Sequence, residues 1–216
     1  MIETTATFAL LGAALGAAQS IPYLRDTWRR WTVPHRGSWL IWSVIEVIAV
    51  ESQRADGARW SLLPLLTQAV GTCAVFLLSI RFGSGGVRRH ELGLMALAGA
   101  GVVGWIVADE PIIATISVVI ADFIAVLMML PKAWRHPHSE TTSTYALASL
   151  GGLAAMGAVG APSLQLLMYP VYFALVNAGL TAVIEGRRRV QRRTSVVELP
   201  PDEAIAREPV PARQPS

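Results

Sequence analysis

WTVPHRGS at residues 31–38 and WRHPHSET at residues 134–141 share one pattern, Trp-x-x-Pro-His-x-x-(Ser/Thr). Each copy follows one apolar stretch and precedes another, and the offset from Trp31 to Trp134 is 103 residues. A motif repeated at matching places in two apolar halves is typical of transporters that arose by duplication of a helical unit. The two stretches therefore predict a membrane protein built from two similar helical halves.

The composition indicates the same class of protein. Of the 216 residues, 53% are hydrophobic and only 15% are charged, whereas soluble domains have about 25% charged residues. The charged residues collect between long apolar runs and in the segment 187–216, so the runs themselves are almost free of charge. A soluble domain of this size cannot bury so many apolar helices. The chain is therefore expected to be all-α and polytopic, with the lipid bilayer as a partner.

The lengths of the apolar runs predict seven transmembrane helices. A hydrocarbon core about 30 Å thick needs roughly 17–25 helical residues per span. The spans are expected at Thr5–Leu24, Ser38–Glu51, Trp60–Ile80, Glu91–Ala108, Pro111–Leu130, Ser143–Gly160 and Ser163–Glu185. Because Ile2–Thr7 contains no Lys or Arg, the first run is expected to be a retained span rather than a cleaved signal peptide.

The basic residues predict the orientation in the membrane. Connections on one side hold most of them, namely Arg25, Arg29, Arg30, Arg36, Arg81, Arg88, Arg89, Lys132, Arg135, Arg187, Arg188, Arg189, Arg192 and Arg193. The other side has only Arg54 and Arg59. Basic loops stay in the cytoplasm during insertion, so the N-terminus is expected outside and the C-terminus inside, in a cell membrane such as the bacterial inner membrane. This rule also explains the net charge of +3 without a nucleic-acid partner.

The sequence divides into four parts. Residues 1–82 are expected to form a first three-helix repeat, 83–110 a linker helix, and 111–186 a second three-helix repeat. The segment 187–216 is rich in proline and charge and has few apolar residues, so it is expected to be a disordered cytoplasmic tail.

The two halves share further features. The first span of each half ends near a proline, Pro22 or Pro131, before a basic loop that contains tryptophan. The third span of each half carries a proline, Pro64 or Pro170. Three spans per half invert the second half unless another span lies between them, so the fourth span is expected to make the repeats parallel.

This three-plus-one-plus-three arrangement resembles the PQ-loop and SWEET superfamily over about Thr5–Glu185. The Pro-Gln pair of that family stands here as Pro22-Tyr23 and Pro131-Lys132, so the glutamine is replaced twice. The stretch from Asp122 to Thr141 is similar to uncharacterised bacterial membrane proteins of this type. The resemblance implies an outside N-terminus, and it implies that Pro22 and Pro131 act as hinges for alternating access.

The leading candidate site residues are polar groups inside the spans, where an ionisable side chain costs about 2.5–3.5 kcal/mol. Asp122 lies nine residues before Pro131, and the 103-residue offset places Gln19 opposite it. This pair is expected to face the interface of the repeats as a substrate-binding or proton-coupling group. The alternative is a protonated aspartate that is hydrogen-bonded for packing alone. Asn177 matches the placement of a pocket-lining asparagine in SWEET-like transporters, and its alternative role is an interhelical hydrogen bond.

Four further residues are weaker candidates for the same site. Glu46 is expected either to share the cavity or to lie near the outer interface. Gln68, four residues after Pro64, is the counterpart of Asn177 in the third span. Trp42 and Tyr145 lie about one turn inside their spans, where aromatic faces suit sugars or apolar amino acids.

The motif residues themselves are interpreted as structural. His35 and His138 lack the cysteine or carboxylate cluster of a zinc site, so no metal is expected. Ser38 and Thr141 are expected to cap the helices that follow them. Several tryptophans are expected in interfacial belts, namely Trp28, Trp31, Trp39, Trp60 and Trp134.

No motif indicates an enzyme or a cofactor. The function indicated is transport of a small solute, such as a sugar or an amino acid, by alternating access, with proton coupling through Asp122 as an extension. The alternative is a non-transporting sensor or scaffold that acts through its cytoplasmic loops and tail. Transport requires a cavity where Gln19, Asp122 and Asn177 converge, whereas the alternative predicts a dry, fully packed interior.

Overall fold

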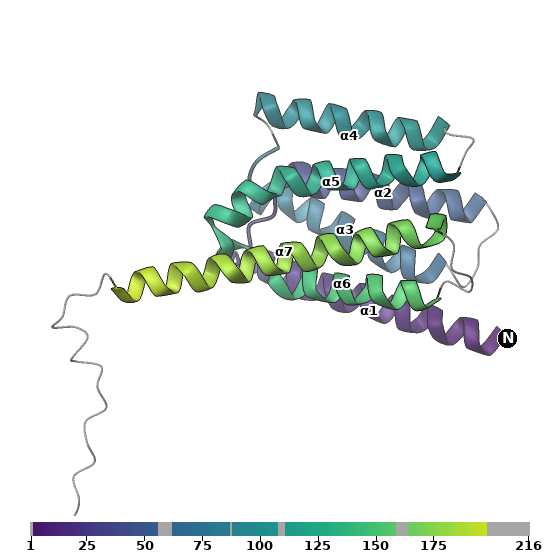
Figure 1. Ribbon diagram of the computed structural model, residues 1–216, viewed down its shortest axis with the longest axis horizontal. Helices are drawn as coiled ribbons and strands as arrows, with labels where there is room; N and C mark the ends of the chain where they lie inside the picture. The colour runs from purple at the N-terminus through teal and green to yellow at the C-terminus, as the bar shows by residue number, and fades with distance from the viewer. Residues whose placement is uncertain (1, 56–61, 87, 108–110, 159–163, 198–216) are drawn as a thin grey trace, which may run out of the picture.

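The computed structural model describes residues 2–55, 62–86, 88–107, 111–158 and 164–197, and these residues form an all-α bundle (Figure 1). The elements are α1 (Ile2–Trp28), α2 (Arg36–Ala55), α3 (Leu62–Phe82), α4 (Arg89–Val107), α5 (Pro111–Arg135), the 3-10 turn η1 (Pro137–Ser139), α6 (Thr142–Ala158) and α7 (Leu164–Val197). The seven α-helices of the described residues correspond closely to the seven predicted apolar segments. Trp60 and the segment 198–216 lie outside the described residues.

Three of the described helices are long and apolar enough to cross a membrane, over Leu62–Phe82, Thr115–Arg135 and Leu167–Thr194. The other predicted spans are also helices in the structure, but their position in a membrane stays a prediction.

The outside of the bundle is apolar. Large hydrophobic side chains exposed there include Leu10, Leu11, Ile21, Val70, Leu77, Leu97, Val103, Ile106, Ile113, Phe123, Leu150, Leu153 and Leu175. Buried positions, by contrast, include the polar side chains of Glu46, Asp122, Glu140 and Asn177. So many exposed large apolar side chains are unusual for a protein in water and indicate contact with lipid or with another apolar surface.

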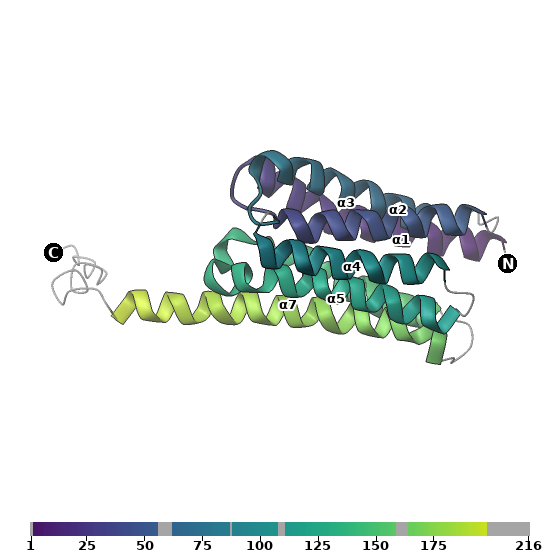
Figure 2. The same cartoon turned by 90° about the horizontal axis from the view of Figure 1, so that it is seen from above.

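The helices pack in two groups of three with the same internal order. In the first group α1 and α2 both pack on α3, and in the second α5 and α6 both pack on α7. The groups meet where α1 packs on α6 and where α2 packs on α5. Figure 2 shows the two groups as separate layers, and Figure 1 shows α4 at the edge of the bundle, where it packs on α5 and α2.

Small residues allow close contact between helices within each of the two groups. A Cβ atom at Gly71 of α3 would lie 2.6 Å from Cβ of Ser20 in α1. A Cβ atom at Gly152 of α6 would lie 2.8 Å from the backbone nitrogen of Ala174 in α7. Both contacts require glycine, because a real Cβ atom does not approach other heavy atoms this closely.

Both copies of the Trp-x-x-Pro-His motif lie at one end of the bundle, which we call the motif end, and α7 projects beyond it (Figure 1). The side chains of Pro34 and Pro137 are fully buried, while Trp31 and Trp134 are exposed. The two copies are joined directly, because the backbone N–H of Val33 donates to the carbonyl oxygen of Ser139 at 3.0 Å.

The prediction of a disordered segment from Arg187 was wrong for residues 187–197, because α7 continues to Val197. Side chains of this extension donate to backbone carbonyls of the second motif copy. Arg187 donates to Trp134 at 3.1 Å, Arg188 donates to Pro137 at 3.1 Å and to Glu140 at 2.5 Å, and Gln191 donates to Arg135 at 3.2 Å. These tertiary contacts offset the low apolar content from which disorder was inferred.

Candidate solute cavity

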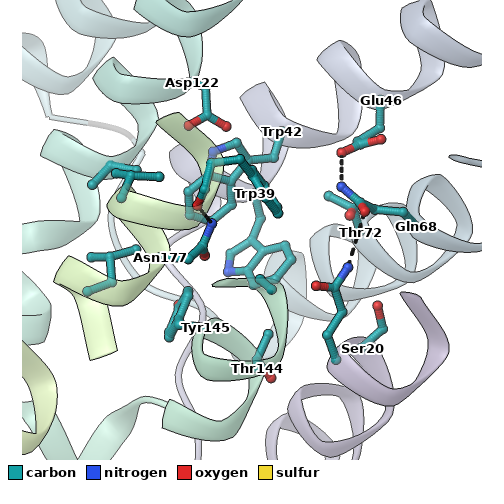
Figure 3. Close-up of a pocket in the computed structure, with 16 residues that line it drawn as sticks. Ser20, Trp39, Trp42, Glu46, Gln68, Thr72, Asp122, Thr144, Tyr145 and Asn177 are labelled. Carbon is teal, nitrogen blue, oxygen red and sulfur yellow. Dashed lines mark hydrogen bonds between the residues drawn. The ribbon is translucent and has the colours of Figure 1, made fainter. Parts of the chain in front are cut away.

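An internal cavity of about 70 Å³ lies between the two three-helix groups (Figure 3). All seven predicted binding candidates line it, namely Gln19, Trp42, Glu46, Gln68, Asp122, Tyr145 and Asn177. The helices α1, α2 and α3 contribute one part of the lining, and α5, α6 and α7 contribute the other. The structure therefore brings the predicted residues together, although it leaves their binding role a prediction.

One wall of the cavity is a chain of three polar side chains from three helices. The Gln19 amide donates to Gln68 at 3.3 Å, and the Gln68 amide donates to the Glu46 carboxylate at 2.5 Å. Glu46 is 8% exposed. Of the two positions that the sequence left open for Glu46, the structure has the one inside the cavity.

The opposite wall contains the second carboxylate, Asp122 of α5. Asp122 accepts a hydrogen bond from the Tyr172 hydroxyl at 2.5 Å, and Trp42 lines the same cavity. Asn177 lies nearby on α7, where its amide donates to the Phe173 carbonyl of its own helix at 2.9 Å. Sequence reasoning missed Tyr172 as a partner of Asp122, because a tyrosine is common in an apolar helix and no repeated spacing marks this one.

Gln19 and Asp122 lie in the same cavity but belong to different hydrogen-bond groups. The 103-residue offset thus selected two residues that line one cavity. They do not bond to each other, because Gln19 donates to Gln68 and Asp122 accepts from Tyr172. Neither Asp122 nor Glu46 has a basic partner among the described residues. A buried carboxylate without such a partner is costly in its charged form.

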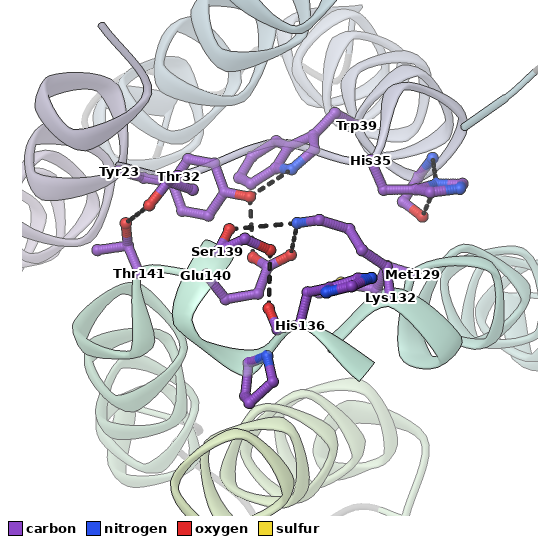
Figure 4. Close-up of polar contacts among 12 residues, drawn as sticks. Tyr23, Thr32, His35, Trp39, Met129, Lys132, His136, Ser139, Glu140 and Thr141 are labelled. Carbon is purple, nitrogen blue, oxygen red and sulfur yellow. Dashed lines mark hydrogen bonds and ion pairs between the residues drawn. The ribbon is translucent and has the colours of Figure 1, made fainter. Parts of the chain in front are cut away.

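A network of buried polar groups lies between the cavity and the motif end, and we call it the closing network (Figure 4). Its centre is Glu140, whose side chain is fully buried. Glu140 forms an ion pair with Lys132 and accepts hydrogen bonds from the hydroxyls of Tyr23 at 3.0 Å and Tyr145 at 2.9 Å. The Trp39 indole N–H donates to the Tyr23 hydroxyl at 3.2 Å.

The closing network joins the two halves at the edge of the cavity. Trp39 and Tyr145 line the cavity and also belong to the network. Trp39 was predicted in an interfacial belt, which is wrong because it is 7% exposed and packs against Tyr23 and Trp42. Trp28, Trp31 and Trp134 are exposed, as the belt requires.

Two members of the network follow the prolines of α1 and α5. Tyr23 follows Pro22 and Lys132 follows Pro131, at the two places where the Pro-Gln pair is altered. Both side chains contact the same Glu140 carboxylate. The replacement of glutamine by Tyr23 and Lys132 was the one sign of this network in the sequence. That Glu140 lies between these two side chains could be seen only in the folded structure.

The motif residues Ser38 and Thr141 do not have the predicted capping role. Ser38 lies inside α2, and its hydroxyl donates to the Ala125 carbonyl of α5 at 2.6 Å. The Thr141 hydroxyl lies 2.6 Å from that of Thr32 and donates to Asp26 at 3.0 Å. Both hydroxyls connect distant parts of the chain, because the motif copies pack against other helices and not only at their own helix ends.

His35 is buried and fixed by two partners. Its Nε2 lies 3.1 Å from the Glu91 carboxylate, and its Nδ1 accepts from the backbone N–H of Ser38 at 3.3 Å. Burial lowers the pKa of His35, although the hydrogen bond to Glu91 opposes that shift. His138 is exposed, so the two histidines are not equivalent. In the described part of the chain no cluster of three or more His, Cys, Asp or Glu residues is arranged for a metal ion.

Comparisons with known proteins add no assignment: no family model, no curated protein and no solved structure matches this chain.

Proposed function

We propose that the protein is a seven-span membrane transporter for a small polar solute, such as a sugar or an amino acid, and that it works by alternating access. We further propose the three-plus-one-plus-three architecture of the PQ-loop and SWEET superfamily, with the N-terminus outside and the motif end in the cytoplasm. The observation that carries the proposal is the cavity, where polar residues from both halves converge inside a bundle with an apolar exterior.

The cavity argues against a passive membrane scaffold. A scaffold has no need of two buried carboxylates, and Glu46 and Asp122 are 8% and 5% exposed. Polar groups inside an apolar bundle are costly, so their convergence on one space favours a binding role over packing. For the alternative function, a sensor or scaffold, we expected a dry and fully packed interior. The polar cavity favours the transporter over this alternative.

The packing order supports two parallel repeats. The third helix of each group lies between the first and the second, and the groups meet through α1 with α6 and α2 with α5. If α1 corresponds to α5 and α2 to α6, the contact of α1 with α6 corresponds to the contact of α5 with α2. This equivalence is expected for halves related by a two-fold axis that runs along the bundle. A site between such halves can open to either side when one half rocks against the other.

The cavity in this conformation is too small for the proposed solute. The cavity of about 70 Å³ holds a few water molecules, whereas pockets for small molecules begin at roughly 300 Å³. The closing network blocks the route toward the motif end, because Tyr23, Tyr145 and Glu140 are buried together there. Access from this end requires separation of α1 from α6, and Pro22 and Pro131 lie beside the residues that must move.

Asp122 is the proposed proton-coupling group. Its carboxylate lies at the cavity wall, within hydrogen-bond distance of Tyr172 and without a basic partner among the described residues. Proton uptake at such a carboxylate removes the cost of a buried charge. Binding of solute and proton to the same cavity would couple the two if both favour the same conformation.

Uptake of labelled sugars and amino acids into proteoliposomes tests this function. We expect at least one compound to accumulate when a pH gradient is imposed, and we expect Asp122→Asn to abolish this gradient-driven accumulation while exchange of the compound persists. Glu51→Gln is the matched control, because it removes one acidic charge from an exposed side chain outside the cavity. A broad panel with no uptake would favour the sensor or scaffold. Equal losses in both variants would reject the role of Asp122.

A further inference from the structure

A second pocket lies at the surface of the motif end, between the two copies of the motif. Its walls include Arg30, Trp31, Arg135, His136, His138 and Gln191. The first two come from the loop after α1, the next three from the second motif copy, and Gln191 from the extension of α7. The space between these residues, about 470 Å³, is open to solvent on its outer side.

The lining of this pocket is basic and contains no acidic residue. The acidic side chains of the described chain at this end have other partners: Asp26 pairs with Arg25, Glu91 with His35, Glu140 with Lys132, and Glu185 with Arg188. Arg30 and Arg135 are exposed, and in the described part of the chain neither forms an ion pair with a carboxylate. The Arg30 guanidinium lies over the Phe82 ring, 5.4 Å from its centroid, a contact through the flat face of the group that leaves its N–H edge able to bind an anion. Among the described residues, two guanidinium groups without a carboxylate partner therefore line one concave surface.

The backbone holds the two sides of the pocket in place. Arg30 has a left-handed φ of 61°, which is costly for a residue other than glycine, and its N–H donates to the Thr27 carbonyl at 3.0 Å. The Val33–Ser139 backbone hydrogen bond joins the two motif copies beneath the pocket, and Gln191 donates to the Arg135 carbonyl. The two arginines are therefore presented by fixed segments of the two halves, and Gln191 of α7 holds the segment that carries Arg135.

We propose that this pocket binds a phosphate group, either of an anionic lipid headgroup or of a small phosphorylated compound. A guanidinium group matches the oxygens of phosphate with two parallel hydrogen bonds, and basic pockets between helices at the cytoplasmic surface suit anionic headgroups. Trp28, Trp31 and Trp134 are exposed around this end, as expected at the depth of the headgroups. The proposal does not depend on transport, because the pocket shares no lining residue with the inner cavity.

Binding to the full-length protein with paired variants tests the proposal. Native mass spectrometry measures the binding of phosphatidylglycerol against phosphatidylcholine, and calorimetry measures the binding of inorganic phosphate in detergent without lipid. The pocket variant is Arg30→Asn with Arg135→Gln, since asparagine tolerates the left-handed φ of Arg30. The matched control is Arg192→Asn with Arg193→Gln, which removes the same charge from exposed positions outside the pocket.

We expect the pocket variant to weaken binding at least about tenfold, the value of one charge-assisted hydrogen bond, while the control variant binds like the wild type. Loss of phosphatidylglycerol binding alone identifies a lipid headgroup, and loss of phosphate binding identifies a soluble ligand. Equal effects in the two variants, or none in either, would overturn the proposal and leave a solvated basic surface. If the double variant does not fold, Arg135→Gln alone is compared with Arg192→Asn by the same criterion.

Discussion

The closing network leads to a quantitative prediction for Glu140→Gln. The Glu140 side chain is fully buried and that of Lys132 is 12% exposed. The substitution therefore leaves the Lys132 ammonium group without its carboxylate partner at a site with little access to water. Breaking a buried ion pair by removing one member costs about 3–5 kcal/mol. Glutamine keeps one oxygen that can accept from Tyr23 or Tyr145, so we expect the lower end of this range. The free energy of unfolding in mixed micelles should therefore fall by about 3 kcal/mol.

A second substitution separates the unpaired charge from simple loss of packing. Lys132→Met in the Glu140→Gln background removes the unpaired ammonium group. We expect this second substitution to raise the free energy of unfolding by at least about 1 kcal/mol above that of the single variant. Glu185→Gln is the control, because Glu185 is 42% exposed in its pair with Arg188, and an exposed pair is worth about 0–1 kcal/mol. A cost below about 1 kcal/mol for Glu140→Gln, or a double variant less stable than the single one, would refute the reasoning.

Two further predictions concern packing and pH. Gly152→Ala should destabilise the protein by about 1–3 kcal/mol, because its Cβ would lie 2.8 Å from the Ala174 backbone nitrogen. Gly151→Ala meets nothing within 4 Å and should be neutral or stabilising by up to about 1 kcal/mol; equal effects of the two in a thermal unfolding assay would contradict the α6–α7 packing. Burial lowers the pKa of His35 from 6.5, so the unfolded chain binds the proton first and stability is lost as the pH falls from 6.5 through the lowered value. His35→Gln should remove this acid-sensitive part of the unfolding profile between pH 7 and 5, and an unchanged profile would exclude His35 as its source.

Much of the helical structure could be predicted from the sequence. Apolar runs of span length, separated by charged and proline-containing loops, predicted seven helices close to the observed bounds, since helix length and polarity are local properties of the chain. The end of α7 was not predictable in this way. Its last turns contain few apolar residues and are held by Arg187, Arg188 and Gln191 against carbonyls more than forty residues earlier in the chain.

The residues that line the candidate cavity could be predicted from the sequence, but the hydrogen bonds between them could not. Polar residues are conspicuous in apolar spans, and their cost in a membrane singles out Asp122, Gln19 and Asn177 without knowledge of the fold. Tyr172 and Glu140 were missed as parts of the site because tyrosines and loop acids have many ordinary positions. Only the three-dimensional packing shows that Tyr172 donates to Asp122 and that Glu140 lies between Tyr23 and Lys132.

The sequence by itself determined the class of secondary structure, the apolar exterior and the duplicated motif, because each follows from residue type and spacing along the chain. Tertiary structure alone decided which polar groups are partners, that Ser38 and Thr141 connect helices instead of capping them, and that the motif copies form one basic pocket. The physical reason is that hydrogen bonds and ion pairs act over about 3 Å, and sequence spacing does not specify which distant side chains come within that range.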